Sequence, residues 1–162
     1  MQISTRCLTR AAIIAAIYTA LTELAVLLNL AYGPIQFRFS EALCVLPFVM
    51  PEAVPGLFVG CLLSNILSPY GLLDIVIGSL ATLLAALATA KCRKRALAPL
   101  PPVISNALLV GALIAWEEVG FSAAFAATFA YNALTVGLGE AAVCYLLGIP
   151  LLHFMEKGRV SR

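Results

Sequence analysis

Eight polar side chains stand out in this sequence because each interrupts or borders an apolar segment. They comprise three acids, four amides and one arginine: Gln36, Arg38, Glu41, Asn65, Asp74, Asn106, Asn132 and Glu140. Carboxylates accept hydrogen bonds, amides donate and accept them, and arginine only donates. A cavity lined by these groups suits a neutral or cationic ligand rich in N–H donors. It does not suit a phosphorylated ligand, which would require several Arg or Lys side chains.

Catalytic chemistry has little support in the sequence. No GxxxxGK[ST] phosphate-binding motif occurs, so we expect no ATP hydrolysis by the chain itself. The single histidine, His153, has no nucleophile or acid beside it in a catalytic pattern. The five cysteines show neither a CxxC pair nor a zinc spacing. We therefore expect a binding protein without enzymatic activity, metal or cofactor.

The composition indicates that lipid surrounds this chain. Hydrophobic residues make up 62% of it and charged residues only 11%, with a mean hydropathy of +1.02. Soluble domains are about one quarter charged. Long Ala- and Leu-rich runs favour helices over the short alternating strands of a barrel. The sequence predicts one all-α integral membrane domain over residues 1–162.

Six transmembrane helices are predicted to position the polar residues. They cover about 7–30, 40–50, 55–67, 72–90, 101–116 and 123–154, the last bent near Gly148 and Pro150. The second and third are short for a crossing that takes about 20 residues. A re-entrant pair with four full spans is therefore the alternative to six.

The basic residues predict the orientation. Nine of the ten fall into three groups, before the first helix, between the fourth and fifth, and after the last: Arg6 and Arg10; Lys91, Arg93, Lys94 and Arg95; Lys157, Arg159 and Arg162. Six spans place all three groups on one side, which the positive-inside rule makes the cytoplasm. Both termini are then cytoplasmic. Arg38 is the exception, and it lies among the polar residues at the outer helix ends, where we expect a cavity that opens outward.

Some of these residues also have a purely structural interpretation. Asn65 and Asn106 can link helices by hydrogen bonds, and Arg38 can pair with Glu41. Glu140 has no basic residue predicted at its depth, and ionisable groups inside a membrane usually face a cavity or a partner. A binding role is therefore favoured for Glu140.

Small residues repeat along the first predicted helix. Ala12, Ala16 and Ala20 follow one another at intervals of four. This spacing lets a second helix approach closely in lipid. The partner can be another subunit or another helix of the same bundle, and the spacing does not distinguish the two.

One segment carries a family resemblance. Residues 33–43, GPIQFRFSEAL, together with GCLLSN at 60–65, DIVIGSLATL at 74–83, NAL at 106–108 and GLGE at 137–140, resemble the QueT family, the substrate-binding S-components of energy-coupling factor (ECF) importers. The resemblance implies a six-helix S-component bundle. It also implies a 7-deazaguanine ligand, such as a queuosine precursor or queuine. The implied partners are a membrane coupling subunit, which faces the alanines of the first helix, and two ATPases that use ATP.

The resemblance implies roles for the polar residues. Glu140 or Glu41 would accept the N–H donors of the guanine-like edge, because one carboxylate can accept two donors. The remaining bonds would come from the other candidates, Gln36, Asn65, Asn106 or Arg38. Asp74 would pair with an aminomethyl cation on the ligand. The alternative is a stand-alone secondary transporter or channel for a small polar solute. A membrane enzyme and a purely structural subunit fit the residues less well.

Overall fold

The computed structural model of the protein describes residues 4–31, 35–68 and 71–160, which form helices and no strand. The elements in chain order are α1 (Thr5–Leu27), η1 (Phe39–Phe48), α2 (Ala53–Ile66), α3 (Gly71–Thr89), η2 (Arg95–Leu97), α4 (Leu100–Val119), α5 (Phe125–Val143), η3 (Cys144–Gly148) and α6 (Ile149–Val160). Four stretches are long and apolar enough to cross a membrane: Thr5–Leu27, Gly71–Thr89, Arg95–Val119 and Phe125–Lys157. The predicted all-α membrane fold is confirmed.

Most predicted helices lie within a few residues of the observed ones. The prediction for 72–90 matches α3, and that for 55–67 matches α2. The prediction for 101–116 ends too early, because α4 continues to Val119 and includes both glutamates after Trp116.

The second predicted helix differs from the others in its winding. Residues 39–48 form the 3-10 helix η1, with Pro47 inside it. Proline has no N–H to donate to the carbonyl four residues earlier, which disfavours an α-helix here. At about 2.0 Å per residue, η1 is about 20 Å long and does not cross a hydrocarbon core of about 30 Å. Its residues 40–47 are buried, so η1 lies inside the bundle.

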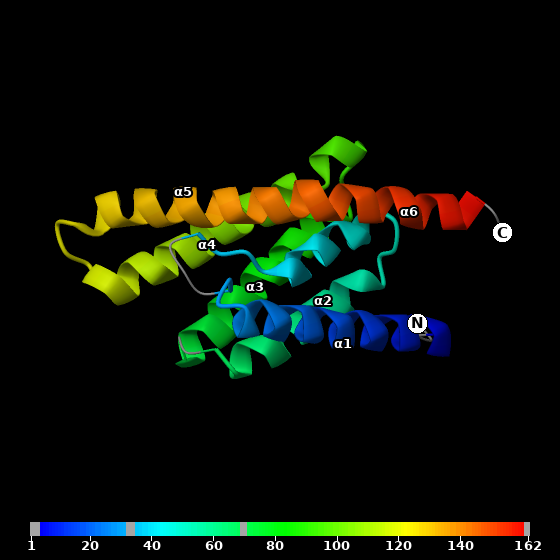
Figure 1. Ribbon diagram of the computed structural model, residues 1–162, viewed down its shortest axis with the longest axis horizontal. Helices are drawn as coiled ribbons and strands as arrows, with labels where there is room; N and C mark the ends of the chain where they lie inside the picture. Colours follow the sequence, from blue (N-terminus) through cyan, green and yellow to red (C-terminus); the bar gives the residue numbers. More distant parts are fainter. Residues whose placement is uncertain (1–3, 32–34, 69–70, 161–162) are drawn as a thin grey trace.

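The last three elements form one continuous rod (Figure 1). The predicted bend near Gly148 and Pro150 corresponds to a π turn, η3, immediately before Pro150. Proline would clash with the carbonyl four residues earlier in a regular α-helix, and a wider turn relieves that clash. Gly148 brings η3 against η1, since a Cβ at this position would lie 3.0 Å from Val45 Cγ1.

Helix α1 has two faces made of small residues. On one face, Ala11 and Ala15 pack against glycines of α2: a Cβ at Gly56 would lie 2.6 Å from the Ala11 carbonyl oxygen, and one at Gly60 would lie 2.9 Å from that of Ala15. The alanines singled out in the sequence lie on the other face, and all three are exposed: Ala12, Ala16 and Ala20. Packing within the bundle therefore uses the first face and leaves the second uncovered.

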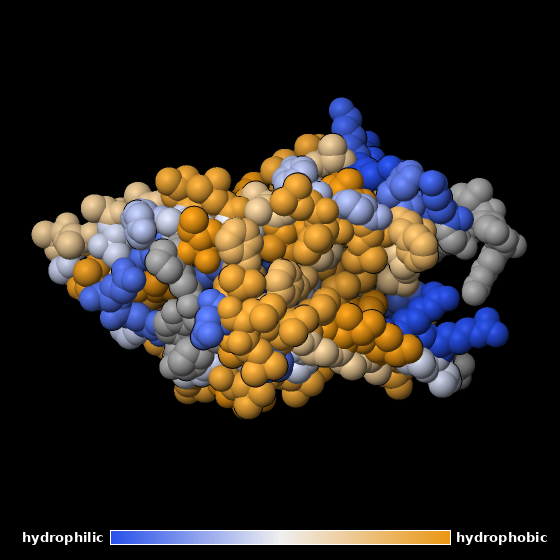
Figure 2. Space-filling view, viewed as in Figure 1, coloured by the Kyte–Doolittle hydropathy of each residue, from blue (hydrophilic) through white to orange (hydrophobic). Residues whose placement is uncertain are grey.

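Both termini and the basic segment 91–95 lie at the same end of the molecule (Figure 1). Two ion pairs tie elements together at this end. Arg10 of α1 bonds Glu52, just before α2, at 2.7 Å, and Arg95 bonds Glu156 of α6. Figure 2 shows hydrophobic residues covering the middle of the molecule and hydrophilic ones gathered toward its two ends, as a membrane-spanning protein requires.

Candidate functional site

A small polar cavity lies between η1, α3, α4, α5 and the segment before η1. Its lining is Gln36, Arg38, Glu41, Gly78, Thr82, Asn106, Val110, Val136 and Glu140. Its volume of about 20 Å³ accommodates a single water molecule. Elements far apart in the sequence thus bring two carboxylates, two amides, a hydroxyl and a guanidinium to one place.

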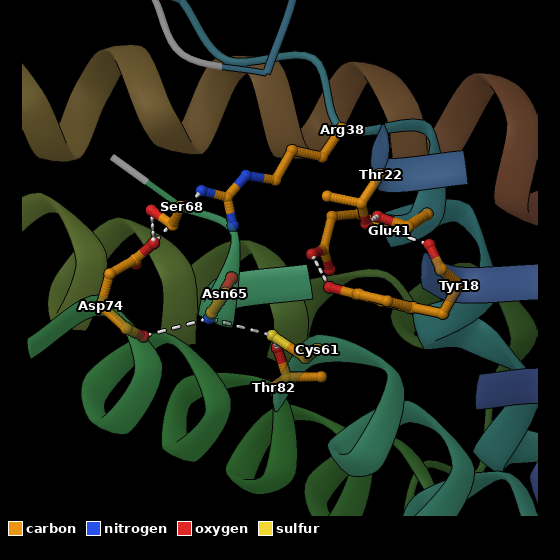
Figure 3. Close-up of polar contacts among 10 residues, drawn as sticks. Tyr18, Thr22, Arg38, Glu41, Cys61, Asn65, Ser68, Asp74 and Thr82 are labelled. Atoms are coloured by element: carbon orange, nitrogen blue, oxygen red, sulfur yellow. Dashed lines mark hydrogen bonds and ion pairs between the residues drawn. The ribbon is translucent and has the colours of Figure 1, made fainter. Parts of the chain in front are cut away.

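Glu41 is fixed in this cavity by two neighbours. The Tyr18 hydroxyl of α1 donates a hydrogen bond to Oε1 of Glu41 (Figure 3). The Cys44 thiol, one 3-10 turn further along η1, donates to Oε2 at 3.0 Å. One turn after Tyr18, Thr22 donates to the Ser40 hydroxyl at 2.7 Å. Two successive turns of α1 therefore hold two successive residues of η1, and Glu41 is only 3% exposed.

Glu140 enters the cavity from α5 and is 7% exposed. The Cys144 thiol lies 3.5 Å from Oε1 of Glu140 and 3.3 Å from the backbone carbonyl oxygen of Glu41. Cys144 therefore connects the elements that carry the two acids. Beside Glu140, Gly139 permits close backbone contact, because a Cβ there would collide with the Gln36 carbonyl. The segment 35–38 thus lies directly on α5.

Arg38 connects the cavity to a second polar cluster (Figure 3). Its guanidinium lies 4.0 Å from the Asp74 carboxylate. Ser68 donates to that carboxylate at 2.5 Å, and the Asn65 amide donates to the Asp74 backbone carbonyl at 3.0 Å. Asp74 is 1% exposed, so its charge is buried together with that of Arg38. The structure pairs this arginine with Asp74, the partner that the sequence had not suggested.

Five of the eight candidate residues line the cavity: Gln36, Arg38, Glu41, Asn106 and Glu140. The other three are not among the lining residues. Asn65 and Asp74 belong to the neighbouring cluster just described, and Asn132 donates to Glu118 at 3.0 Å. That last contact joins α5 to the end of α4.

Sequence reasoning missed two polar contributors, Tyr18 and Thr82. Thr82 lines the cavity and donates to the Cys61 thiol at 3.2 Å. Both residues are 1% exposed. The available signal was the hydroxyl of Tyr18 inside an apolar helix, since a buried tyrosine hydroxyl usually requires a hydrogen-bond partner.

Metal binding finds no support at this site. Within the described ranges, no group of three or more His, Cys, Asp or Glu residues is arranged to hold a metal ion. The thiols of the site serve instead as hydrogen-bond donors to carboxylate and carbonyl oxygens. The arrangement can therefore bind a polar ligand by hydrogen bonds and charge.

Comparison with known proteins identifies the family that this chain resembles. Residues 8–157 match the family described as QueT transporter. A Lactococcus lactis subsp. cremoris (strain MG1363) protein, named "Queuosine precursor transporter QueT", is 42% identical over 72 residues. That alignment covers 44% of this chain and 42% of the relative, so the chain matches less than half of the relative's length. No solved structure matches the chain.

Proposed function

Because the chain belongs to the QueT transporter family, we propose that it is the substrate-binding membrane subunit of an ECF-type importer. It captures a 7-deazaguanine, a queuosine precursor or queuine, from outside the cell. It passes the ligand inward through a membrane coupling subunit driven by two ATPases. The observation that supports this most is the buried cavity in which Glu41, Glu140, Asn106 and Arg38 meet.

The cavity supplies the groups that a guanine-like edge requires. Such an edge presents adjacent N–H donors beside a carbonyl acceptor. One carboxylate can accept both donors, and an amide or a guanidinium can donate to the carbonyl. Glu41 and Glu140 are the acceptors available here, and Asn106 and Arg38 are the donors. A phosphorylated ligand is disfavoured, because Arg38 is the only lining cation among the described residues.

Binding a whole base requires the cavity to widen. A volume of about 20 Å³ is far below the roughly 300–1,000 Å³ of common ligand pockets. The walls contributed by α3, α4 and α5 are regular helices. The wall at residues 35–38 is irregular and rests on Gly139. Movement of this wall gives the ligand room without unwinding a membrane helix.

The exposed face of α1 provides the contact for the coupling subunit. Ala12, Ala16 and Ala20 are uncovered, whereas Ala11 and Ala15 are used against α2. A flat strip of small residues permits close helix–helix approach in lipid. This division of α1 into an inner and an outer face supports a contact outside the bundle.

We infer the orientation of the chain in the membrane from the end of the molecule that carries most of its basic residues. Both termini and the segment 91–95 share that end (Figure 1), and nine of the ten basic residues belong to these three segments. The positive-inside rule assigns it to the cytoplasm. The opposite end, which includes the connection between α4 and α5 (Figure 1), then faces outward.

Reconstitution tests this function against stand-alone transport. Purified chain should bind a 7-deazaguanine, and small molecules that co-purify with it should include one by mass spectrometry. Proteoliposomes containing the chain alone should show no uptake, and those that also contain a coupling subunit and ATPases should show ATP-dependent uptake. Uptake by the chain alone would establish the secondary-transporter alternative instead.

A further inference from the structure

An apolar groove opens between α1 and α6, near the end of the molecule that carries both termini and the segment 91–95, which we call the basic end (Figure 1). Its volume is about 580 Å³, which lies within the roughly 300–1,000 Å³ of common ligand pockets. Residues of α1 and α6 form its sides, and leucines of η1 lie between them: Ile13, Ile17, Leu151, Phe154, Leu43 and Leu46. The groove is separate from the polar cavity, since no described residue lines both.

The groove follows from the position of η1 between the two helices. Helices α1 and α6 both pack on η1. Leu43 and Leu46 of η1 are buried, so an occupant of the groove reaches side chains that belong to the hydrophobic core. An unfilled groove would deprive these side chains of dispersion contacts on one side. In a membrane, the occupant that supplies those contacts is apolar.

The side chains that line the groove are large. Ile13 is 53% exposed and Phe154 is 73% exposed, so both project from their helices. Close approach of a second helix in lipid requires small residues instead, and these lie on the exposed alanine face of α1 described above. A flexible acyl chain can follow the spaces between isoleucine, leucine and phenylalanine side chains, and it needs no flat strip. The lining therefore favours a lipid chain over a protein helix.

Basic residues lie at both sides of the groove. Arg10 of α1 lines it, and Arg6 lies one helical turn earlier. On α6, Lys157 follows Phe154 by three residues, so it continues the same helix face toward the basic end. Glu52 accepts a hydrogen bond from Nη1 of Arg10 at 2.7 Å. A guanidinium has five N–H donors, so Arg10 keeps donors for a further acceptor.

The charge at this end favours an anionic partner. Nine of the ten basic residues belong to the three segments there, and two acids, Glu52 and Glu156, pair with arginines at the same end. Figure 2 shows hydrophobic residues between two groups of hydrophilic ones at the basic end. Basic pockets between transmembrane helices bind anionic lipid headgroups, and arginine donates strong hydrogen bonds to phosphate oxygens.

We propose that this groove binds an anionic glycerophospholipid. One acyl chain lies between α1 and α6 against Leu43 and Leu46, and the phosphate accepts hydrogen bonds from Arg10. The same short helix η1 carries Glu41, so the bound chain supports the element that positions this acid in the polar cavity. The lipid site does not depend on which solute the protein transports.

Native mass spectrometry of the purified full chain tests the site. The protein is titrated with phosphatidylglycerol and, separately, with phosphatidylcholine of identical acyl chains, so that only the headgroup charge differs. We expect the wild type to bind phosphatidylglycerol about tenfold more tightly, which is the effect of one hydrogen bond between charged groups. Arg10→Gln should bring the two affinities within about threefold of each other. Arg10→Lys, which keeps the charge, should retain the preference.

Two matched controls separate the headgroup contact from the chain contact. Arg93→Gln removes an exposed cation of the segment 91–95 that does not line the groove, and it should leave both affinities unchanged. Ile17→Trp places a larger side chain in the groove and should weaken both lipids at least tenfold. Leu24→Trp should not, because Leu24 has nearly the same exposure on α1, 45% against 44%, and lies outside the lining.

Equal binding of the two lipids by the wild type would overturn the proposal, and so would a preference that persists in Arg10→Gln. Matching titrations of Ile17→Trp and Leu24→Trp would exclude the groove as the site of the acyl chain. This pair still decides the matter if Arg10→Gln shows no cooperative melting transition. If no lipid is retained and Ile17→Trp prevents assembly with a coupling subunit, the groove receives a protein helix and the lipid site is refuted.

Discussion

Replacing Tyr18 with Phe tests whether the packing of α1 positions the binding acid. The substitution removes one oxygen and keeps the ring, which is 1% exposed. The lost hydroxyl is the donor to Oε1 of Glu41, a carboxylate oxygen that is buried with it. A hydrogen bond to a charged group contributes about 1.5–3 kcal/mol. We expect Tyr18→Phe to lower the free energy of unfolding by about that amount, because the buried Glu41 carboxylate loses a hydrogen-bond donor.

The same change should weaken ligand binding. Without the Tyr18 hydroxyl, Cys44 is the one of these two donors that still orients Glu41. A loss of about 1.4 kcal/mol in binding is tenfold in the dissociation constant, and we expect at least that loss. The control is Tyr131→Phe, which removes a hydroxyl from a tyrosine that is 58% exposed. Melting curves and titrations that match between the two variants would refute a positioning role for Tyr18.

Three further substitutions test other parts of the structure. Ala16→Leu should abolish uptake by the assembled importer while ligand binding persists. Ala15→Leu should instead lower the melting temperature, because of these two alanines only Ala15 is buried against α2. Normal uptake by the Ala16→Leu variant would contradict the proposed coupling face. Gly139→Ala should reduce ligand affinity, because the added methyl group overpacks the contact with residues 35–38, and overpacking costs about 1–3 kcal/mol. Gly137→Ala should not, because a Cβ at Gly137 would lie no closer than 3.3 Å to its nearest neighbour, Ala107 Cβ. Equal titrations of the two variants would exclude contact between the irregular wall and α5. Asp74→Asn should lower the melting temperature, because it removes a buried carboxylate that lies beside the Arg38 guanidinium and accepts a hydrogen bond from Ser68. An unchanged melting temperature would show that these contacts are not needed for stability.

The long helices were predictable because their signal is local. The run that becomes α3 carries no charged residue between Asp74 and Lys91, and a turn at Ser68 precedes it. Length and hydropathy alone locate such a helix in a membrane protein. The 3-10 winding of η1 was not predictable in this way. It depends on Pro47 and on packing against α1, α2, α3, α5, η3 and α6. Contacts between segments so far apart in the chain produce no periodic pattern in the sequence.

The candidate site was predictable in its residue types and only partly in its partners. Ionisable residues in apolar segments identified Glu41 and Glu140 without knowledge of the fold. Their surroundings depend on contacts between distant segments, since Cys144 reaches the Glu41 carbonyl across 103 positions. The pairing of Arg38 with Asp74 likewise follows from how α3 packs beside the segment before η1. Neither contact is indicated by a pattern in the local sequence.

The rod made of α5, η3 and α6 is longer than the bilayer is thick. Its 33 residues, Phe125–Lys157, extend about 50 Å at 1.5 Å per residue, against a hydrocarbon thickness of about 30 Å. Even at the largest usual tilt of about 40° the rod still measures about 38 Å along the membrane normal. At least one end of the rod must therefore emerge into the headgroup region or water, and the α6 end carries charged residues that favour this, including Glu156 in its ion pair with Arg95. A peripheral subunit can contact a projecting end of α6 from the aqueous side, whereas the alanine face of α1 is accessible only to a neighbour within the lipid.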